Sequence, residues 1–187
     1  MDRRQRKTRD AIFNAFTKLL KNEPYSKITV QKIIDMADIG RTTFYAHFEA
    51  KDDLLSSLCT EIFDHVFSDD LKKEKTHDFS DHHDTQAMIT HVLYHLQEHM
   101  DYLPGLVAEE SGEVFMFFFK HHLKDLFSAI VPASAYHVPY DYVLNHMVCD
   151  FAETVRWWTV NKQYSPEEIS TFFLETTTSL NPSFYKS

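Results

Sequence analysis

The amino-acid sequence predicts an all-α fold with a small N-terminal helical domain and a larger C-terminal helical domain. Its 187 residues include three glycines and six prolines, far fewer than a fold built from strands and tight turns requires. Apolar residues recur at helical spacing in segments long enough for helices. The hydrophobic fraction of 43% and the aromatic fraction of 14% exclude a disordered chain and indicate a bulky aromatic core.

The N-terminal part reads as three helices. The first is expected over residues 3–22, and Pro24 ends it. A second helix begins after Thr29, a suitable N-cap, and the residues 38–40 interrupt its pattern. A short third helix follows over residues 41–47. Two short helices joined by a three-residue turn predict a helix-turn-helix, whose second helix lies in the major groove of DNA.

The remaining chain reads as a set of longer helices. One begins at Lys51, and the segment 68–84 has no apolar face and is interpreted as a surface loop. Further helices are expected over residues 85–102, 113–130, 140–162 and 166–180, with Ser165 capping the last of them. No stretch resembles a signal peptide or is long and apolar enough to cross a bilayer, so we expect a cytoplasmic protein that does not contact the membrane.

The charge distribution separates the two parts of the chain. Residues 1–51 contain eleven Lys or Arg and six Asp or Glu, a net charge of +5, whereas the remaining residues sum to −14. A polyanion is attracted to the first part and repelled by the second. Any nucleic acid is therefore expected to bind the N-terminal part. The basic run of Arg3, Arg4, Arg6 and Lys7 can reach the nucleic-acid backbone or minor groove, and a merely solvated run of charge is the alternative for these residues.

The segment from Ala37 to Leu54 resembles the signature of the tetracycline-repressor (TetR) family. The residues that match it in register are Thr43, Phe44, Tyr45, His47, Phe48, Lys51 and Leu54. The resemblance is close over residues 1 to about 55, and beyond them only the number and lengths of the helices agree. Asp38 stands where the family commonly has Gly, and Gly40 where it commonly has a capping Ser. Both residues are compatible with the turn.

This resemblance implies a homodimeric transcriptional regulator, expected to be a repressor, that binds double-stranded operator DNA and responds to an unknown small-molecule effector. Residues 1–50 would form the helix-turn-helix DNA-binding domain, and residues 51–187 the helical effector-binding and dimerisation domain. No cofactor is required. An enzyme is not expected, because the sequence has no phosphate-binding Gly loop, nucleophile elbow or HExxH motif.

The resemblance also implies roles for individual residues of the N-terminal part. Three residues at the start of the third helix would reach base edges: Arg41, Thr42 and Thr43. Others would hold phosphates, the last two as weaker candidates: Tyr45, His47, Lys51, Thr29 and Lys32. Their chemistry suits these roles, because a guanidinium forms paired bonds with guanine, and phenol, imidazole and ammonium groups donate to phosphate oxygens.

In the C-terminal part the resemblance implies a dimer formed by the last two helices, and an effector pocket among the others. The candidate seam or core residues of the dimer are Trp157, Trp158, Phe172, Phe173 and Thr176. The candidate pocket residues are Met88, His91, His95, Phe115, Phe118 and Phe119. Ordinary core packing is the alternative for the aromatic members of the pocket set.

The chain has twelve histidines, and three of them recur one helical turn apart at His91, His95 and His99. His82 and His83 precede them. Two His residues one turn apart can converge on a transition metal, so a metal-responsive repressor that uses residues 82–99 is an alternative. A polar stripe on a helix surface is the preferred explanation of the spacing, because no cysteine lies nearby and no zinc motif is complete. A helical protein-interaction module is a further alternative for the whole chain.

Overall fold

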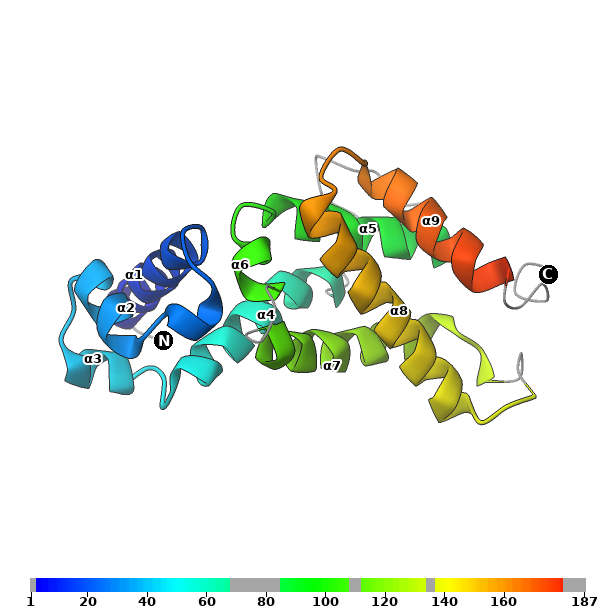
Figure 1. Cartoon of the computed structure of the whole chain (residues 1–187). Helices are drawn as coiled ribbons and strands as arrows, with labels where there is room; N and C mark the ends of the chain where they lie inside the picture. Colours follow the sequence, from blue (N-terminus) through cyan, green and yellow to red (C-terminus); the bar gives the residue numbers. More distant parts are fainter. Residues whose placement is uncertain (1–2, 68–84, 108–111, 134–136, 180–187) are drawn as a thin grey trace. The chain divides into compact units, whose positions relative to one another are not determined.

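The computed structural model describes residues 3–67, 85–107, 112–133 and 137–179, and the regular structure in these ranges is helical (Figure 1). The elements are α1 (Arg3–Leu20), η1 (Tyr25–Lys27), α2 (Val30–Ala37), α3 (Arg41–Tyr45), α4 (Lys51–Phe67), α5 (Thr85–Glu98), α6 (Leu103–Val107), α7 (Gly112–Ile130), α8 (Tyr140–Val160) and α9 (Pro166–Ser179). The all-α prediction is confirmed. The predicted loop 68–84 lies outside the described residues.

The chain divides into two compact units. The first comprises Met1–Glu61 and His99–Phe118, and the second comprises Ile62–Glu98 and Phe119–Ser187. The division falls within α4 and within α7. The domain boundary predicted after residue 50 lies at the end of the DNA-binding motif, whereas the division into units reflects which segments pack together. The domain boundary stays a prediction.

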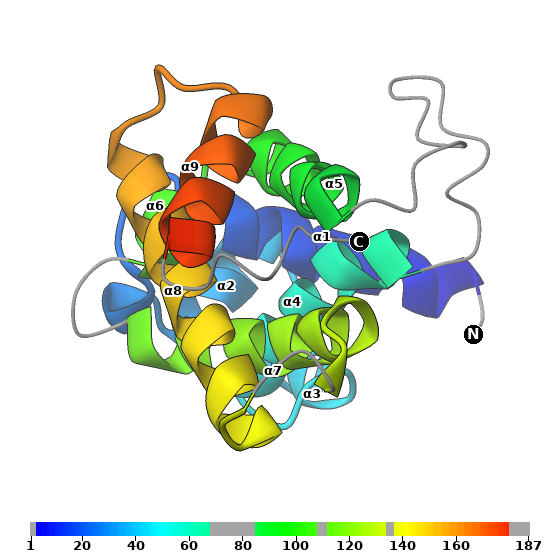
Figure 2. The ribbon, with the colours of Figure 1, turned by 90° about the vertical axis from the view of Figure 1, so that its right-hand side faces the viewer.

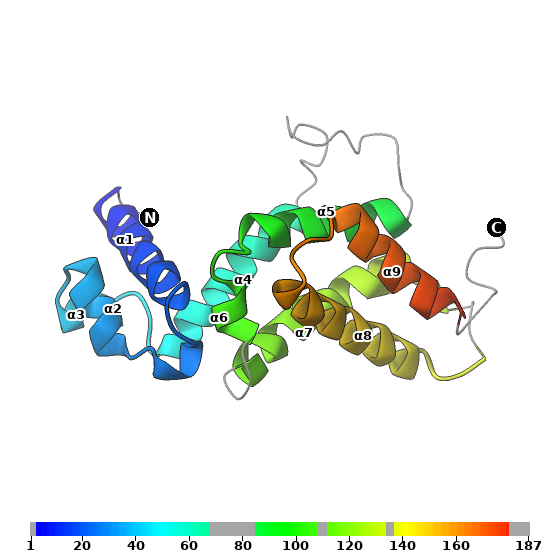
Figure 3. The same ribbon diagram turned by 45° about the horizontal axis from the view of Figure 1, so that its top comes forward.

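The core of the first unit is built from the apolar faces of α1, α2 and α3. α1 packs against α2, and α2 packs against α3, as Figure 3 shows. Phe44 is fully buried, and its ring centroid lies 5.9 Å from that of Phe48. The Phe48 ring in turn meets the edge of Phe13 on α1 at 5.7 Å. These aromatic contacts fix the short α3, which cannot be stable alone, on the rest of the unit.

The turn between α2 and α3 forms as the sequence predicts. The Thr29 hydroxyl caps α2 by accepting a hydrogen bond from the Lys32 amide at 3.2 Å. Asp38 ends α2 in the left-handed region, with φ 52° and ψ 50°, a conformation that Asp adopts more readily than most residues. Gly40 precedes α3 as its N-cap without a side-chain bond. Neither departure from the family pattern prevents the helix-turn-helix from forming.

α6 lies close to the end of α1 within the first unit. A Cβ atom on Gly105 would be 2.2 Å from the carbonyl oxygen of Leu20, so this approach requires glycine. Lys21 and Asp101 form an ion pair at 2.7 Å nearby. The helix expected over residues 85–102 therefore differs from the structure: α5 ends at Glu98, and α6 restarts at Leu103 with Pro104 in its first turn, where proline is tolerated.

The second unit has an aromatic core. α9 packs against both α5 and α8, and Figure 2 shows it between them. Phe151 of α8 contacts Phe127 of α7 and Phe173 of α9, with ring centroids 5.8 Å and 5.1 Å away. Ser165 and Glu168 exchange hydrogen bonds at the start of α9, which confirms the predicted cap. In the described ranges no helix combines the length and apolar character that crossing a membrane requires.

Candidate nucleic-acid interface

The helix α3 exposes a polar face while its apolar side is buried. Phe44 has no exposed surface, whereas Arg41 and Thr42 are exposed and the Tyr45 side chain is 48% exposed. Thr43 is half-buried. The three side chains predicted to read bases thus begin α3, and two of them face solvent. Such an arrangement can bring a guanidinium and hydroxyl groups to the base edges of a major groove.

The N-terminal end of α2 carries two of the predicted phosphate ligands. Thr29 and Lys32 are both exposed. The Lys32 ammonium pairs with Glu23 at 2.7 Å and donates to the Lys27 carbonyl at 3.0 Å. This ion pair is on the surface, where an exchange of partners costs little free energy. His47, also predicted to hold a phosphate, is half-buried beside Phe48.

Lys51 is oriented differently from the other predicted phosphate ligands. Its ammonium donates to the carbonyl oxygens of Tyr25 at 2.9 Å and Ile28 at 2.8 Å. It also lies 3.9 Å from the centroid of the Tyr25 ring. Burial lowers the pKa of Lys51, although the neighbouring Asp52 acts in the opposite direction. The amine is therefore bonded within the first unit.

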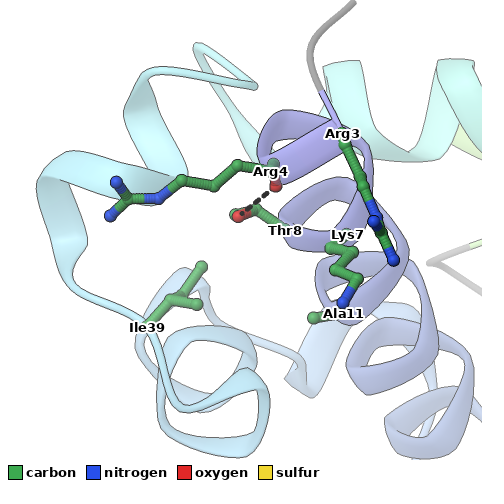
Figure 4. Close-up of a pocket in the computed structure, with 6 residues that line it drawn as sticks. All are labelled: Arg3, Arg4, Lys7, Thr8, Ala11 and Ile39. Carbon is green, nitrogen blue, oxygen red and sulfur yellow. Dashed lines mark hydrogen bonds between the residues drawn. The ribbon is translucent and has the colours of Figure 1, made fainter.

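A basic hollow lies at the N-terminal end of α1. It is lined by Arg3, Arg4, Lys7, Thr8, Ala11 and Ile39, and Figure 4 shows Arg4 extending on one side of α1 while Arg3 and Lys7 extend on another. Ile39 belongs to the turn before α3, so this positive charge is next to the helix-turn-helix. The sequence indicates the basic run but not its closeness to Ile39.

The residues predicted to form an effector pocket are distributed over both units. In the second unit, Met88 is half-buried and Phe119 is buried, as are His91 and His95, whose Nε2 atoms are 2.9 Å apart. In the first unit, Phe115 is buried and Phe118 is half-buried. A hydrogen bond between two buried imidazoles satisfies polar groups that would otherwise be costly in an apolar interior.

The third histidine of the predicted metal cluster, His99, belongs to the first unit, where its ring lies 5.4 Å from that of Tyr102. His82 and His83 lie outside the described residues. Among the residues that are described, no group of three or more His, Cys, Asp or Glu side chains is placed to hold a metal ion. The geometry therefore adds nothing in favour of the metal-responsive alternative.

The residues predicted at the dimer seam fall into two sets. Trp158 and Phe173 are each 1% exposed, and the Trp158 indole donates to the Tyr164 carbonyl, so both belong to the core of their own chain. Trp157, Phe172 and Thr176 are exposed and line a groove between α8 and α9. Phe173 also contributes to the lining of this groove, but its side chain is buried.

These features define a helical protein with an exposed helix-turn-helix of the DNA-binding type and a separate unit with an aromatic core. Residues 12–58 match the family model described as Bacterial regulatory proteins, tetR family. Residues 83–179 match the model described as Transcriptional regulator C-terminal region.

Solved structures of similar fold agree with these two family matches. A TetR transcriptional regulator from Streptococcus agalactiae 2603V is 31% identical, with a TM-score of 0.70, over 94% of this chain and 96% of that chain. The dihydroxyacetone kinase operon activator DhaS is 19% identical (TM-score 0.63, 96% and 98% covered), and a TetR-family regulator from Syntrophomonas wolfei str. Goettingen is 16% identical (TM-score 0.68, 94% and 95% covered). These last two share the fold.

A curated relative matches over part of its length. YxbF, an HTH-type transcriptional regulator of Bacillus subtilis (strain 168), is 38% identical over 71 residues, which span 35% of this chain and 19% of that protein. The chain belongs to the TetR family of transcriptional regulators. It is a helix-turn-helix regulator and not an enzyme, as the sequence predicts.

Proposed function

We propose that this protein is a homodimeric repressor that binds double-stranded operator DNA through α3 and leaves it when a small molecule binds the C-terminal part. The observation that carries the proposal is the exposed polar face of α3 above the fully buried Phe44. In this proposal Arg41, Thr42 and Thr43 approach base edges in the major groove. Arg41 is the main reader, because a guanidinium bonds guanine in a bidentate manner.

Phosphate contacts would flank the reading helix. Thr29 and Lys32 approach the backbone from α2, and Tyr45 and His47 approach it from the end of α3. The charge of +5 on residues 1–51 supports this side as the DNA-facing one, since the rest of the chain carries −14. Residues 1–50 therefore act as the DNA-binding domain and residues 51–187 as the effector-binding and dimerisation domain.

A second copy of the chain is the proposed occupant of the groove between α8 and α9. In this groove Trp157 is 46% exposed and Phe172 38% exposed, and large apolar side chains are costly to leave in water. The Trp157 ring stacks on Tyr164 at 5.5 Å, so this surface is preformed. A dimer also suits the function, because one reading helix contacts too few base pairs for specificity.

The effector is proposed to be a small organic molecule bound in the C-terminal domain, with no cofactor required. Its candidate contacts within the second unit are Met88, His91, His95 and Phe119. The His91–His95 pair supports a ligand with at least one polar group, because these buried imidazoles can exchange their mutual hydrogen bond for one to the ligand. A regulator of this kind works in the cytoplasm, where its operator is.

In vitro selection from a random double-stranded DNA library tests the proposal. The expected product is an inverted repeat whose half-sites are about one helical turn, roughly 10 base pairs, apart. Affinity for the selected duplex should fall steeply as salt rises, because phosphate contacts release counterions. Failure to enrich any sequence, or an affinity insensitive to salt, would overturn the proposal and favour a protein-interaction module.

A further inference from the structure

The first turn of α4 holds the 3-10 turn η1 through two consecutive residues. The Lys51 ammonium donates to the Tyr25 and Ile28 carbonyls at 2.9 Å and 2.8 Å, and Asp52 accepts a hydrogen bond from the Tyr25 hydroxyl. Tyr25 is 3% exposed, and its ring meets the edge of Phe16 at 6.1 Å. We call Tyr25, Lys51 and Asp52 the α4–η1 brace.

The brace leaves the Lys51 ammonium little capacity for another ligand. An ammonium has three N–H donors, and two of them are used on carbonyl oxygens. The Tyr25 ring covers a further part of the group, with its centroid 3.9 Å from Nζ, a distance suited to a cation–π interaction. A phosphate contact would require breaking these bonds in a half-buried place.

The position of the brace explains what it does. Ile28, whose carbonyl Lys51 holds, immediately precedes Thr29, the N-cap of α2. α2 packs on α3, so the direction in which α2 leaves η1 also sets the direction of the reading helix. A displacement of the Ile28 carbonyl would therefore shift the start of α2 and, through the contact between α2 and α3, the reading helix.

We propose that Lys51 is a positioning residue, which with Tyr25 and Asp52 sets α2 and α3 on the first turn of α4, and that it does not neutralise a DNA phosphate. This inference rests on the proposed DNA-binding function, and it differs from the role that the family resemblance assigns to Lys51. It divides the cations of the first unit into two groups. Exposed ones such as Arg4 face solvent near the turn, whereas Lys51 acts through the backbone that it holds.

Two measurements on the full-length protein and the selected duplex test the assignment. The first is the slope of the logarithm of the affinity against the logarithm of the salt concentration, for the parent and for Lys51→Met. A lost phosphate contact lowers this slope by about 0.9 for each protomer. The second is the ratio of affinities for the selected duplex and a scrambled one. A misplaced base contact lowers this ratio by about tenfold, whereas a lost phosphate contact weakens both duplexes equally.

The expected result is that Lys51→Met keeps the slope of the parent and loses about tenfold in discrimination. Tyr25→Phe removes no positive charge and should also lower the ratio of affinities for the selected and scrambled duplexes. Lys51→Arg keeps the charge and the donors, so it should retain most of the parent's ratio. Circular dichroism verifies that each variant is folded. A slope reduced by about 0.9 per protomer with unchanged discrimination overturns the assignment. So does unchanged discrimination in both Lys51→Met and Tyr25→Phe. A parent that does not discriminate overturns the proposed function as well.

Discussion

Replacement of Gly105 by alanine should destabilise the first unit through a clash with the backbone of α1. The added Cβ would lie 2.2 Å from the Leu20 carbonyl oxygen and 3.3 Å from the Glu23 carbonyl oxygen. Carbon–oxygen contacts are normally about 3.3 Å or longer, so α6 must move by about 1 Å from α1. Backbone atoms of a helix end cannot rotate away as a side chain can.

The cost follows from this geometry. Overpacking of a well-packed site costs about 1–3 kcal/mol, and a backbone obstacle places Gly105→Ala near the upper limit. For a chain of this size, each kcal/mol lowers the unfolding temperature by about 2–4 °C, so the expected fall is about 6–12 °C. The ion pair between Lys21 and Asp101, 2.7 Å apart, should also weaken, because it joins the same two segments.

Gly40→Ala is the matched control for this change. Its added Cβ would meet only the Thr43 hydroxyl oxygen, at 3.7 Å, and its φ of −78° suits alanine. It should cost less than about 1 kcal/mol, the penalty of a poorer N-cap. Thermal unfolding followed by circular dichroism measures both variants, and hydrogen exchange of the amides at the end of α1 locates the effect. Equal unfolding temperatures for Gly105→Ala and the parent would refute the reasoning.

Three further predictions concern other parts of the chain. Burial raises the pKa of the Cys59 thiol to about 12, whereas Cys149 is half-buried. A thiol reagent at neutral pH should therefore label Cys149 in the native protein and reach Cys59 only after unfolding. Rapid labelling of both cysteines in the folded state would be inconsistent with the packing. Trp157→Glu should shift the protein from dimer to monomer in sedimentation equilibrium, because it replaces an exposed aromatic side chain of the α8–α9 groove by a charge. Met36→Glu on α2 should leave the dimer intact, and an unchanged dimer in Trp157→Glu would exclude the groove as the interface. Asp38→Gly should raise the free energy of unfolding by about 0.5 kcal/mol. Glycine adopts the left-handed conformation without the strain that a Cβ causes, and this gain outweighs the added freedom of glycine in the unfolded chain. An unfolding temperature lower than that of the parent would contradict this prediction.

Local features of the fold were predictable because neighbouring residues determine them. The apolar spacing of α1, the Thr29 cap, the turn at Asp38 and the Ser165 cap all depend on residues within one or two helical turns of one another. The burial of Phe44 beneath an exposed α3 surface follows from the same spacing, and the structure agrees with it.

Features that depend on distant residues were not predictable in the same way. α6 contacts Leu20 because Gly105 lets the two backbone segments approach closely. These residues are more than eighty positions apart in the sequence, and no local pattern indicates that they meet. Likewise, Lys51 matches the family motif in type and position, but its bonds to Tyr25 and Ile28 depend on how α4 and η1 pack. Adjacent tryptophans on α8 point to core and surface respectively, which their shared chemistry does not distinguish.

The ratio of affinities for the selected duplex and a scrambled duplex, measured for the parent and Arg41→Ala at one salt concentration, tests the central claim most directly. The parent should prefer the selected duplex by about a thousandfold or more. Arg41→Ala should lose about 1–3 kcal/mol of that preference at each half-site, while Lys124→Ala, which removes an exposed cation from α7, retains it. A parent that binds both duplexes equally, or an Arg41→Ala variant that discriminates as well as the parent, would contradict the assignment of α3 as the reading helix.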